Sequence, residues 1–215
     1  MAGLAATPSP SLALAIGCLA LALCGDGVSA ALAFERRAVL AGEFWRLWTG
    51  HAVHFSLAHA LANAGVLFAC GRLVETAAGA RRTVLLMLAG APLISLALLL
   101  FAPAMAEYRG ASGLASAFAV PAAAALWPLG RAWRLAITGA TATFTIKTVL
   151  EAYALPIGSA VLPDGVGVAW QSHLLGACIG AVSAWSSRLV RRSRPIEGRL
   201  VFSQTARRLM SLWSR

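Results

Sequence analysis

The stretch Arg109-Gly110-Ala111-Ser112-Gly113 introduces a run of small apolar residues that continues to Leu129. A later apolar segment holds a single histidine, His173. A serine between glycines at the start of one helix and a histidine inside another are residue types that form a nucleophile and its base. These two segments decide the fold, because such chemistry requires the two apolar helices to meet.

The composition of the chain favours a membrane protein. Of the 215 residues, 59% are hydrophobic and 12% are charged, whereas soluble domains have roughly 45–50% apolar and about 25% charged residues. The net charge of +10 can indicate nucleic-acid binding. Here the basic residues lie between apolar runs and in the C-terminal tail, so we expect them to face anionic lipid and expect no nucleic-acid partner.

The four cysteines do not predict a metal site or a redox compartment. They lie in apolar stretches, form no CxxC pair and have no histidine at metal-ligand spacing. The four are Cys18, Cys24, Cys70 and Cys178. We interpret them as small hydrophobic residues and expect no metal and no cofactor.

Six apolar segments are long enough to cross a bilayer core of about 30 Å. The predicted spans are residues 11–33, 51–74, 83–101, 112–129, 133–155 and 168–190. We therefore predict an all-α membrane protein with one six-helix domain over residues 1–190. The basic tail, 191–215, is either an interfacial helix or unstructured. The first span could instead be a signal peptide, although no basic residue precedes it.

The distribution of basic residues predicts the orientation in the membrane. With six spans, the arginines between spans two and three, between spans four and five, and in the tail all fall on one side. That side is the cytoplasm by the positive-inside rule. Both termini are then cytoplasmic, and Ser112 and His173 lie at similar depth near the outer face. We expect a bacterial cytoplasmic membrane, with the site opening to the periplasm.

The context of Ser112 favours a nucleophile. A helix start leaves backbone N–H groups unpaired, so an oxyanion that develops there has donors beside it. Gly110 and Gly113 allow the backbone to come close. The alternative interpretation is that Ser112 only caps its helix.

The context of His173 favours a helix–helix contact. Gly176 and Gly180 share its helix face, and small faces let membrane helices approach closely. The fourth span has a matching small face that includes Ser112 and Ser116. Ionisable residues inside membranes are costly and mostly functional, but a structural histidine bonded to a carbonyl is the alternative.

Two hydrogen-bond donors share one face of the second span. His59 and Asn63 are four residues apart, and donors that point at one place can form an oxyanion hole. His54 lies off that face, and we expect it to brace the preceding loop. The alternative is a polar cluster that only holds the outer end together.

The sequence offers no acid placed to orient His173, so a Ser–His dyad is the simpler prediction. Asp164 lies in a loop, and Glu107 precedes the serine. Lys147 and Glu151 are four residues apart on the fifth span. They form either an intramembrane pair or a pair near the outer interface.

Together these residues resemble the rhomboid intramembrane serine proteases over nearly the whole chain after Ala33. The family has a GxSG serine at the start of the fourth helix and a histidine in AHxxGxxxG in the sixth. The matching residues are Gly110, Ser112 and Gly113, then His173, Gly176 and Gly180 after Ser172, then His54, His59 and Asn63 in the HxxxxHxxxN pattern, with Trp45, Arg46 and Glu75 as further matches.

The resemblance implies a six-helix fold and a reaction. Ser112 would attack a peptide carbonyl, His173 would take the proton, and His59, Asn63 and the Ser112 N–H would bind the oxyanion. The loop 156–169 would act as a mobile cap. The implied partners are the lipid bilayer and the transmembrane segment of a membrane-anchored substrate, while the oligomeric state is left open.

Two departures from the family pattern bear on the branch and the activity. Ser116 stands where bacterial rhomboids often have a tyrosine, and Ser172 replaces the alanine before the histidine. Tyr108-Arg109-Gly110 and the compact size look like the rhombosortase branch, which is associated with Gly-Gly C-terminal sorting signals. The alternatives are an inactive rhomboid-like protein that binds membrane helices and an unrelated small transporter.

Overall fold

The structure, a computed structural model, describes residues 9–153 and 168–192. The long helices are α1 (Pro10–Leu23), α5 (Leu57–Ala78), α6 (Ala80–Phe101), α7 (Ser112–Leu126), α8 (Arg131–Ala152) and α9 (Trp170–Arg192). The short elements are α2 (Asp26–Leu32), β1 (Phe34–Glu35), α3 (Arg36–Leu40), α4 (Arg46–Thr49), β2 (Glu107–Tyr108) and the 3-10 turn η1 (Trp127–Leu129). Most of the predicted cap loop and the tail beyond Arg192 lie outside the described residues.

The prediction of an all-α membrane protein is confirmed at the level of fold class. Within the described residues, three helices are long and apolar enough to cross a bilayer: α5, α6 and α7 with its η1 extension. The α1 helix is apolar but has only 14 residues. The α8 and α9 helices have 22 and 23 residues but are less apolar. By length and composition, these three helices indicate a multi-pass membrane protein.

The prediction of one continuous first span over residues 11–33 is wrong. The α1 helix ends at Leu23, and α2 begins at Asp26. Gly25 between them has φ +86°, a left-handed conformation that ends a helix and that glycine adopts without strain. The chain thus leaves the first helix early and starts a compact loop region that extends to Ser56.

The second predicted span also starts too early. Residues 51–56 form a turn, and α5 begins at Leu57 with Ser56 as its N-cap, whose hydroxyl accepts from the His59 N–H at 3.1 Å. His51 and His54 therefore lie in the loop before the helix. The remaining helices begin and end within three residues of their predicted spans. The predicted span 112–129 consists of α7 followed by the η1 turn.

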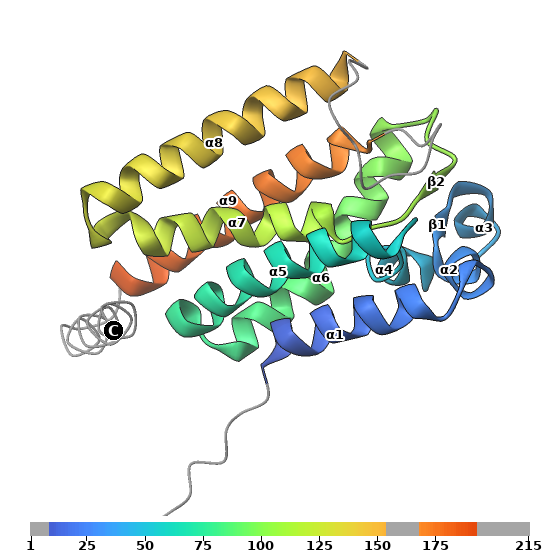
Figure 1. Cartoon of the computed structure of the whole chain (residues 1–215), viewed down its shortest axis with the longest axis horizontal. Coiled ribbons are helices and arrows are strands. Elements are labelled where there is room, and N and C mark those ends of the chain that lie inside the picture. Colours follow the sequence, from blue (N-terminus) through green and yellow to red (C-terminus); the bar gives the residue numbers. More distant parts are fainter. Residues whose placement is uncertain (1–8, 154–167, 193–215) are drawn as a thin grey trace, which may run out of the picture.

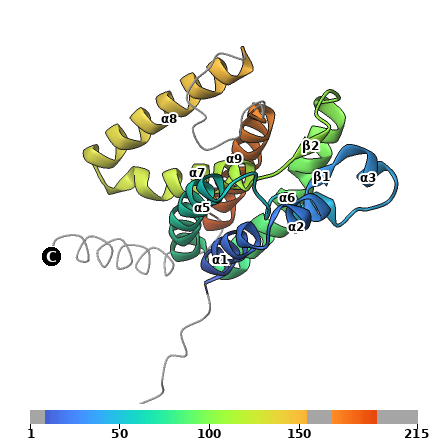
Figure 2. The same ribbon diagram turned by 45° about the vertical axis from the view of Figure 1, so that its right-hand side comes forward.

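The helices are packed unevenly. Among the described elements, the contact between α7 and α9 is the most extensive, and α5 packs against both α7 and α1. Figures 1 and 2 show α8 apart from this group, running along one side of it. Within α8, Thr148 is buried as a whole residue, and the Glu151 side chain also points inward. The core lies between the other long helices, where Leu67, Ile94 and Phe118 are fully buried.

A two-stranded ribbon joins the first loop to the segment before α7. The strands are antiparallel, with Phe34 opposite Tyr108 and Glu35 opposite Glu107. The ribbon lies at the same end of the molecule as α2, α3 and α4 (Figure 1). It places residues 107–111 against the first loop, directly before the start of α7.

Candidate active site

Ser112 is the first residue of α7, and it does not cap that helix. The N-cap is Ala111, and no side chain bonds to the helix start. The interpretation of Ser112 as only a capping residue is therefore not supported by the geometry. Its carbonyl accepts from the Ser116 hydroxyl at 2.9 Å, which ties the first turn of the helix together.

Gly110, two residues before Ser112, lies directly against the side chains of His59 and Asn63. It has φ +136°. A Cβ atom at this position would lie 2.9 Å from His59 Cε1 and 3.3 Å from Asn63 Nδ2. Backbone conformation and space therefore both require glycine here. The structure thus brings His59 and Asn63 to the loop that leads into Ser112.

Some polar atoms beside Gly110 are buried and unpaired. Within the described residues, Asn63 Nδ2 has no hydrogen-bond partner, and neither has His59 Nδ1, although the ring nitrogen of His59 that lies nearer to Gly110 is Nε2. Leaving a buried donor unpaired costs about 1–3 kcal/mol. An oxygen that becomes negatively charged near Gly110 would accept hydrogen bonds from such donors and so remove part of this destabilisation. An oxyanion hole works in this way.

His54 braces the same loop. Its Nε2 accepts a hydrogen bond from the Ala111 N–H at 3.3 Å, so the proton of the neutral ring is on Nδ1. Burial, and then the neighbouring His59, lower the pKa of His54 to about 3. The ring is thus neutral near pH 7, which this acceptor role requires.

The backbones of α7 and α9 touch where Ser112 and His173 lie. A Cβ at Gly113 would lie 3.1 Å from the Ser172 carbonyl oxygen. A Cβ at Gly176 would overlap the Gly113 carbonyl, and one at Gly180 the Ala117 carbonyl. Gly113 and Ser172 are the direct neighbours of Ser112 and His173, so the structure brings the two ends together. Among the described residues, no hydrogen bond joins the two side chains.

Tyr108 lies next to the contact between α7 and α9, and the sequence alone gave it no role in the site. It is buried, and its hydroxyl donates to the Gly110 carbonyl at 2.6 Å. Burial raises the pKa of Tyr108, while the nearby hydroxyls of Ser172 and Ser112 act in the opposite direction. The one sequence signal is that a tyrosine, one of two in the chain, stands two residues before Gly110.

His51 is the second residue that sequence reasoning missed. Its Nε2 lies 2.9 Å from the Ala91 carbonyl and 3.0 Å from the Ser95 hydroxyl, both on α6. Its ring also meets the Tyr108 ring edge-on, with 5.2 Å between centroids. Burial lowers the pKa of His51 to about 4. His51 thus links α6 to the tyrosine under the serine loop.

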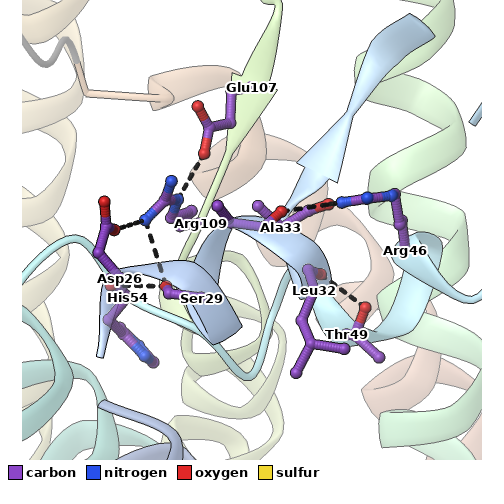
Figure 3. Close-up of polar contacts among 10 residues, drawn as sticks. Asp26, Ser29, Leu32, Ala33, Arg46, Thr49, His54, Glu107 and Arg109 are labelled. Atoms are coloured by element: carbon purple, nitrogen blue, oxygen red, sulfur yellow. Dashed lines mark hydrogen bonds and ion pairs between the residues drawn. The ribbon is translucent and has the colours of Figure 1, made fainter. Parts of the chain in front are cut away.

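Arg109 fixes the other side of the serine loop (Figure 3). Its guanidinium pairs with Asp26 at 2.6 Å and with Glu107, and it lies 5.0 Å from the centre of the Phe55 ring. Burial alone would lower the pKa of Arg109, but the two carboxylates more than offset it and raise that pKa. The arginine therefore stays charged and connects α2 to the segment before Ser112.

The remaining matches to the resemblance lie away from Ser112. Arg46 donates to the Ala33 carbonyl at 2.7 Å and closes the first loop (Figure 3). Trp45 is half exposed on that loop. Glu75 accepts from the Ser11 N–H at 2.7 Å and joins α5 to α1. It lies roughly 24 Å from His59 along the α5 axis.

The sequence shows no acid near His173, but the fold brings one there. Glu151 Oε2, near the end of α8, lies 3.4 Å from His173 Nδ1. The sequence separates the two by a loop, so only the fold could reveal the contact. Within residues 9–153 and 168–192, no group of three His, Cys, Asp or Glu side chains could hold a metal ion.

Comparison with protein families gives one match that covers this site. Residues 41–189 match the family model described as Rhomboid domain. The match spans more than half of the chain and includes both Ser112 and His173. A search of curated proteins gives no match to this chain.

Proposed function

Because the chain belongs to the rhomboid family, we propose that it is an intramembrane serine endopeptidase. It hydrolyses a peptide bond near the outer end of a transmembrane segment of a membrane-anchored protein. The observation that carries this proposal is the convergence of the His59 and Asn63 side chains on Gly110, beside the junction of α7 and α9. Donors gathered over a helix start that carries a serine suit acyl transfer.

In the proposed reaction, the Ser112 oxygen attacks the substrate carbonyl carbon and His173 takes the hydroxyl proton. The oxyanion is held by the Ser112 N–H and by the side chains of His59 and Asn63. His173 then gives the proton to the leaving amine, and an acyl-enzyme results. Water, deprotonated by the same histidine, attacks the ester and releases the acid and Ser112.

The Ala111 N–H has a different part in this scheme. It already donates to His54, so it is not a free oxyanion donor. His54 thereby fixes the direction of the peptide group that joins Gly110 to Ala111, one peptide before the one that carries the Ser112 N–H. The donors that remain for the oxyanion are the Ser112 N–H and the side chains of His59 and Asn63 on α5.

The proposed topology has six spans with both termini in the cytoplasm of a bacterium. The α1, α8 and α9 helices supply the three further spans, and the site opens to the periplasmic side. There water can reach the acyl-enzyme. A substrate helix has no free carbonyl, so it must unwind locally, and helix-breaking residues near its outer end favour cleavage.

Within this function, we place the chain in the rhombosortase branch, with substrates that end in a Gly-Gly sorting signal, a membrane helix and a basic tail. The support is the Tyr108-Arg109-Gly110 run, in which the tyrosine and arginine both hold the serine loop. Co-expression with a Gly-Gly-tailed secreted protein should shorten that protein at its C-terminus. An unchanged C-terminus, with cleavage of other membrane helices, would assign the chain to another branch.

The direct test of the proposed function is labelling of the detergent-purified protein by a fluorophosphonate probe. Wild type should be labelled, and both Ser112→Ala and His173→Ala should lose the label. Ser116→Ala is the matched control, because it removes a hydroxyl one turn further along α7, and it should be labelled like wild type. If folded wild type stays unlabelled while a known rhomboid is labelled in parallel, the chain is an inactive helix-binding relative.

A further inference from the structure

We propose that Glu151 is a positioning residue that orients the His173 imidazole, so that the proposed dyad works with a carboxylate behind it. This inference rests on the proposed function of Ser112 and His173. It concerns a residue of α8, a helix that otherwise has little contact with the rest of the protein.

The geometry places an unpaired carboxylate oxygen against the histidine. Glu151 Oε2 lies 3.4 Å from His173 Nδ1, and the exposed fractions of the two side chains are 4% and 10%. Within the described residues, this oxygen is buried and has no hydrogen-bond partner. The other carboxylate oxygen accepts from the Lys147 ammonium. Glu151 therefore lies between a cation and an imidazole.

The pairing with Lys147 alone does not explain where the carboxylate lies. The Lys147 side chain is 51% exposed, whereas that of Glu151 is 4% exposed. An i,i+4 pair can form entirely on the outer face of a helix, where it loses little solvation. Here the acid lies inward instead, which costs desolvation energy, and it points its free oxygen at His173. That inward placement is the observation that favours a role toward the histidine.

The contact has a defined chemical consequence. When Nδ1–H donates to Glu151, the proton of the neutral ring is held on Nδ1, and Nε2 is left to accept the Ser112 proton. As that proton arrives, the imidazolium gains a carboxylate neighbour that stabilises it. Glu151 itself takes no proton. A distance of 3.4 Å is long for a hydrogen bond, and catalytic hydrogen bonds often shorten when substrate binds.

The mutational test uses the rate of fluorophosphonate labelling, resolved into its maximal rate and its half-saturating probe concentration. We expect Glu151→Gln to lower the maximal rate by about 10- to 100-fold, less than loss of a general base itself, with half-saturation unchanged.

Two controls separate orientation from packing. Thr148→Val changes the buried polar side chain one turn earlier on α8 and should be labelled at the wild-type rate. Lys147→Met removes the other partner of Glu151 and should keep most of the rate. Wild-type labelling of Glu151→Gln overturns this inference and leaves the proposed function intact. Absence of labelling in wild type overturns the proposed function itself.

A measurement on unmutated protein covers the case in which Glu151→Gln does not fold. Nitrogen NMR of the ring-labelled protein should show His173 with its proton on Nδ1, assigned by comparison with His173→Ala. A proton on Nε2 instead would overturn the inference. In that tautomer Nδ1 has no hydrogen to donate to Glu151, and Nε2 cannot accept the Ser112 proton.

Discussion

The α7–α9 contact and α8 are opposite ways of placing a helix in the same membrane protein. The first is made from glycine and alanine backbones that touch, with Gly176 on the Gly113 carbonyl and Gly180 on that of Ala117. The second has large apolar side chains, such as Leu135 and Ile146, that stay exposed. Small residues allow close packing where lipid provides no hydrophobic drive between helices. The serine and histidine positions are therefore fixed by backbone contact, while α8 contributes mainly through its end.

Adding one methyl group to each region should give the largest contrast between them. Gly176→Ala should separate α9 from α7, at a cost of roughly 3 kcal/mol or more, and should abolish probe labelling. Gly139→Ala, on α8, meets nothing within 4 Å and should stabilise its helix by about 0.5–1 kcal/mol. Thermal unfolding in detergent and labelling would measure both. Equal tolerance of the two substitutions would refute the division into a tight region and a loose one.

A second pair of substitutions separates backbone strain from crowding at the site. Gly110 and Gly130 have φ of +136° and +135°, but only Gly110 has a neighbour, His59, near its missing Cβ. Each change to alanine should cost about 1–2 kcal/mol through the left-handed backbone. Only Gly110→Ala should also displace His59 and lower the labelling rate, by at least about tenfold. Loss of labelling in Gly130→Ala would show that strain next to α8 reaches the serine.

A pH dependence of stability should arise on the tightly packed side. Burial lowers the pKa of His51 to about 4 and of His54 to about 3, whereas α8 has no histidine. Below pH 6.5 the unfolded chain takes up protons that the folded protein does not. Stability is therefore complete above pH 6.5 and falls toward pH 4, by about 1.4 kcal/mol per pH unit for each histidine.

Melting temperatures measured at pH 7.5 and 5.0 should show this loss. In His51→Gln, which keeps a hydrogen-bonding side chain without the titration, the decline should be shallower. A decline of the same steepness would assign the pH dependence to groups other than His51.

The sequence was sufficient to predict the helical membrane fold and the approach of two particular helices. Glycines at Gly176 and Gly180, on one face with His173, indicate a close contact whatever the rest of the chain does. That contact could be predicted because the glycine spacing lies within a single helix. The GASG loop and the His59–Asn63 spacing could be recognised for the same reason, since each lies within one segment.

The sequence could not predict contacts that depend on how helices are tilted. Glu151 and Lys147 are recognisable as an i,i+4 pair, but the direction of the acid toward His173 depends on where the end of α8 lies. Tyr108 and His51 were missed for a related reason, since their contact is made by the pairing of β1 with β2 across the first loop. The break at Gly25 had a local signal, Gly25-Asp26-Gly27, and was missed because the apolar residues on both sides were counted as one span.

The packing of α9 onto α7 also bears on how the protein is made. During translation the ribosome adds about 60 residues between Ser112 and His173, which takes roughly 3–12 s at 5–20 residues per second. For that time α7 is in the membrane without the helix that covers its glycine face. In the proposed mechanism, the nascent chain therefore holds the Ser112 nucleophile without its base until α9 is inserted.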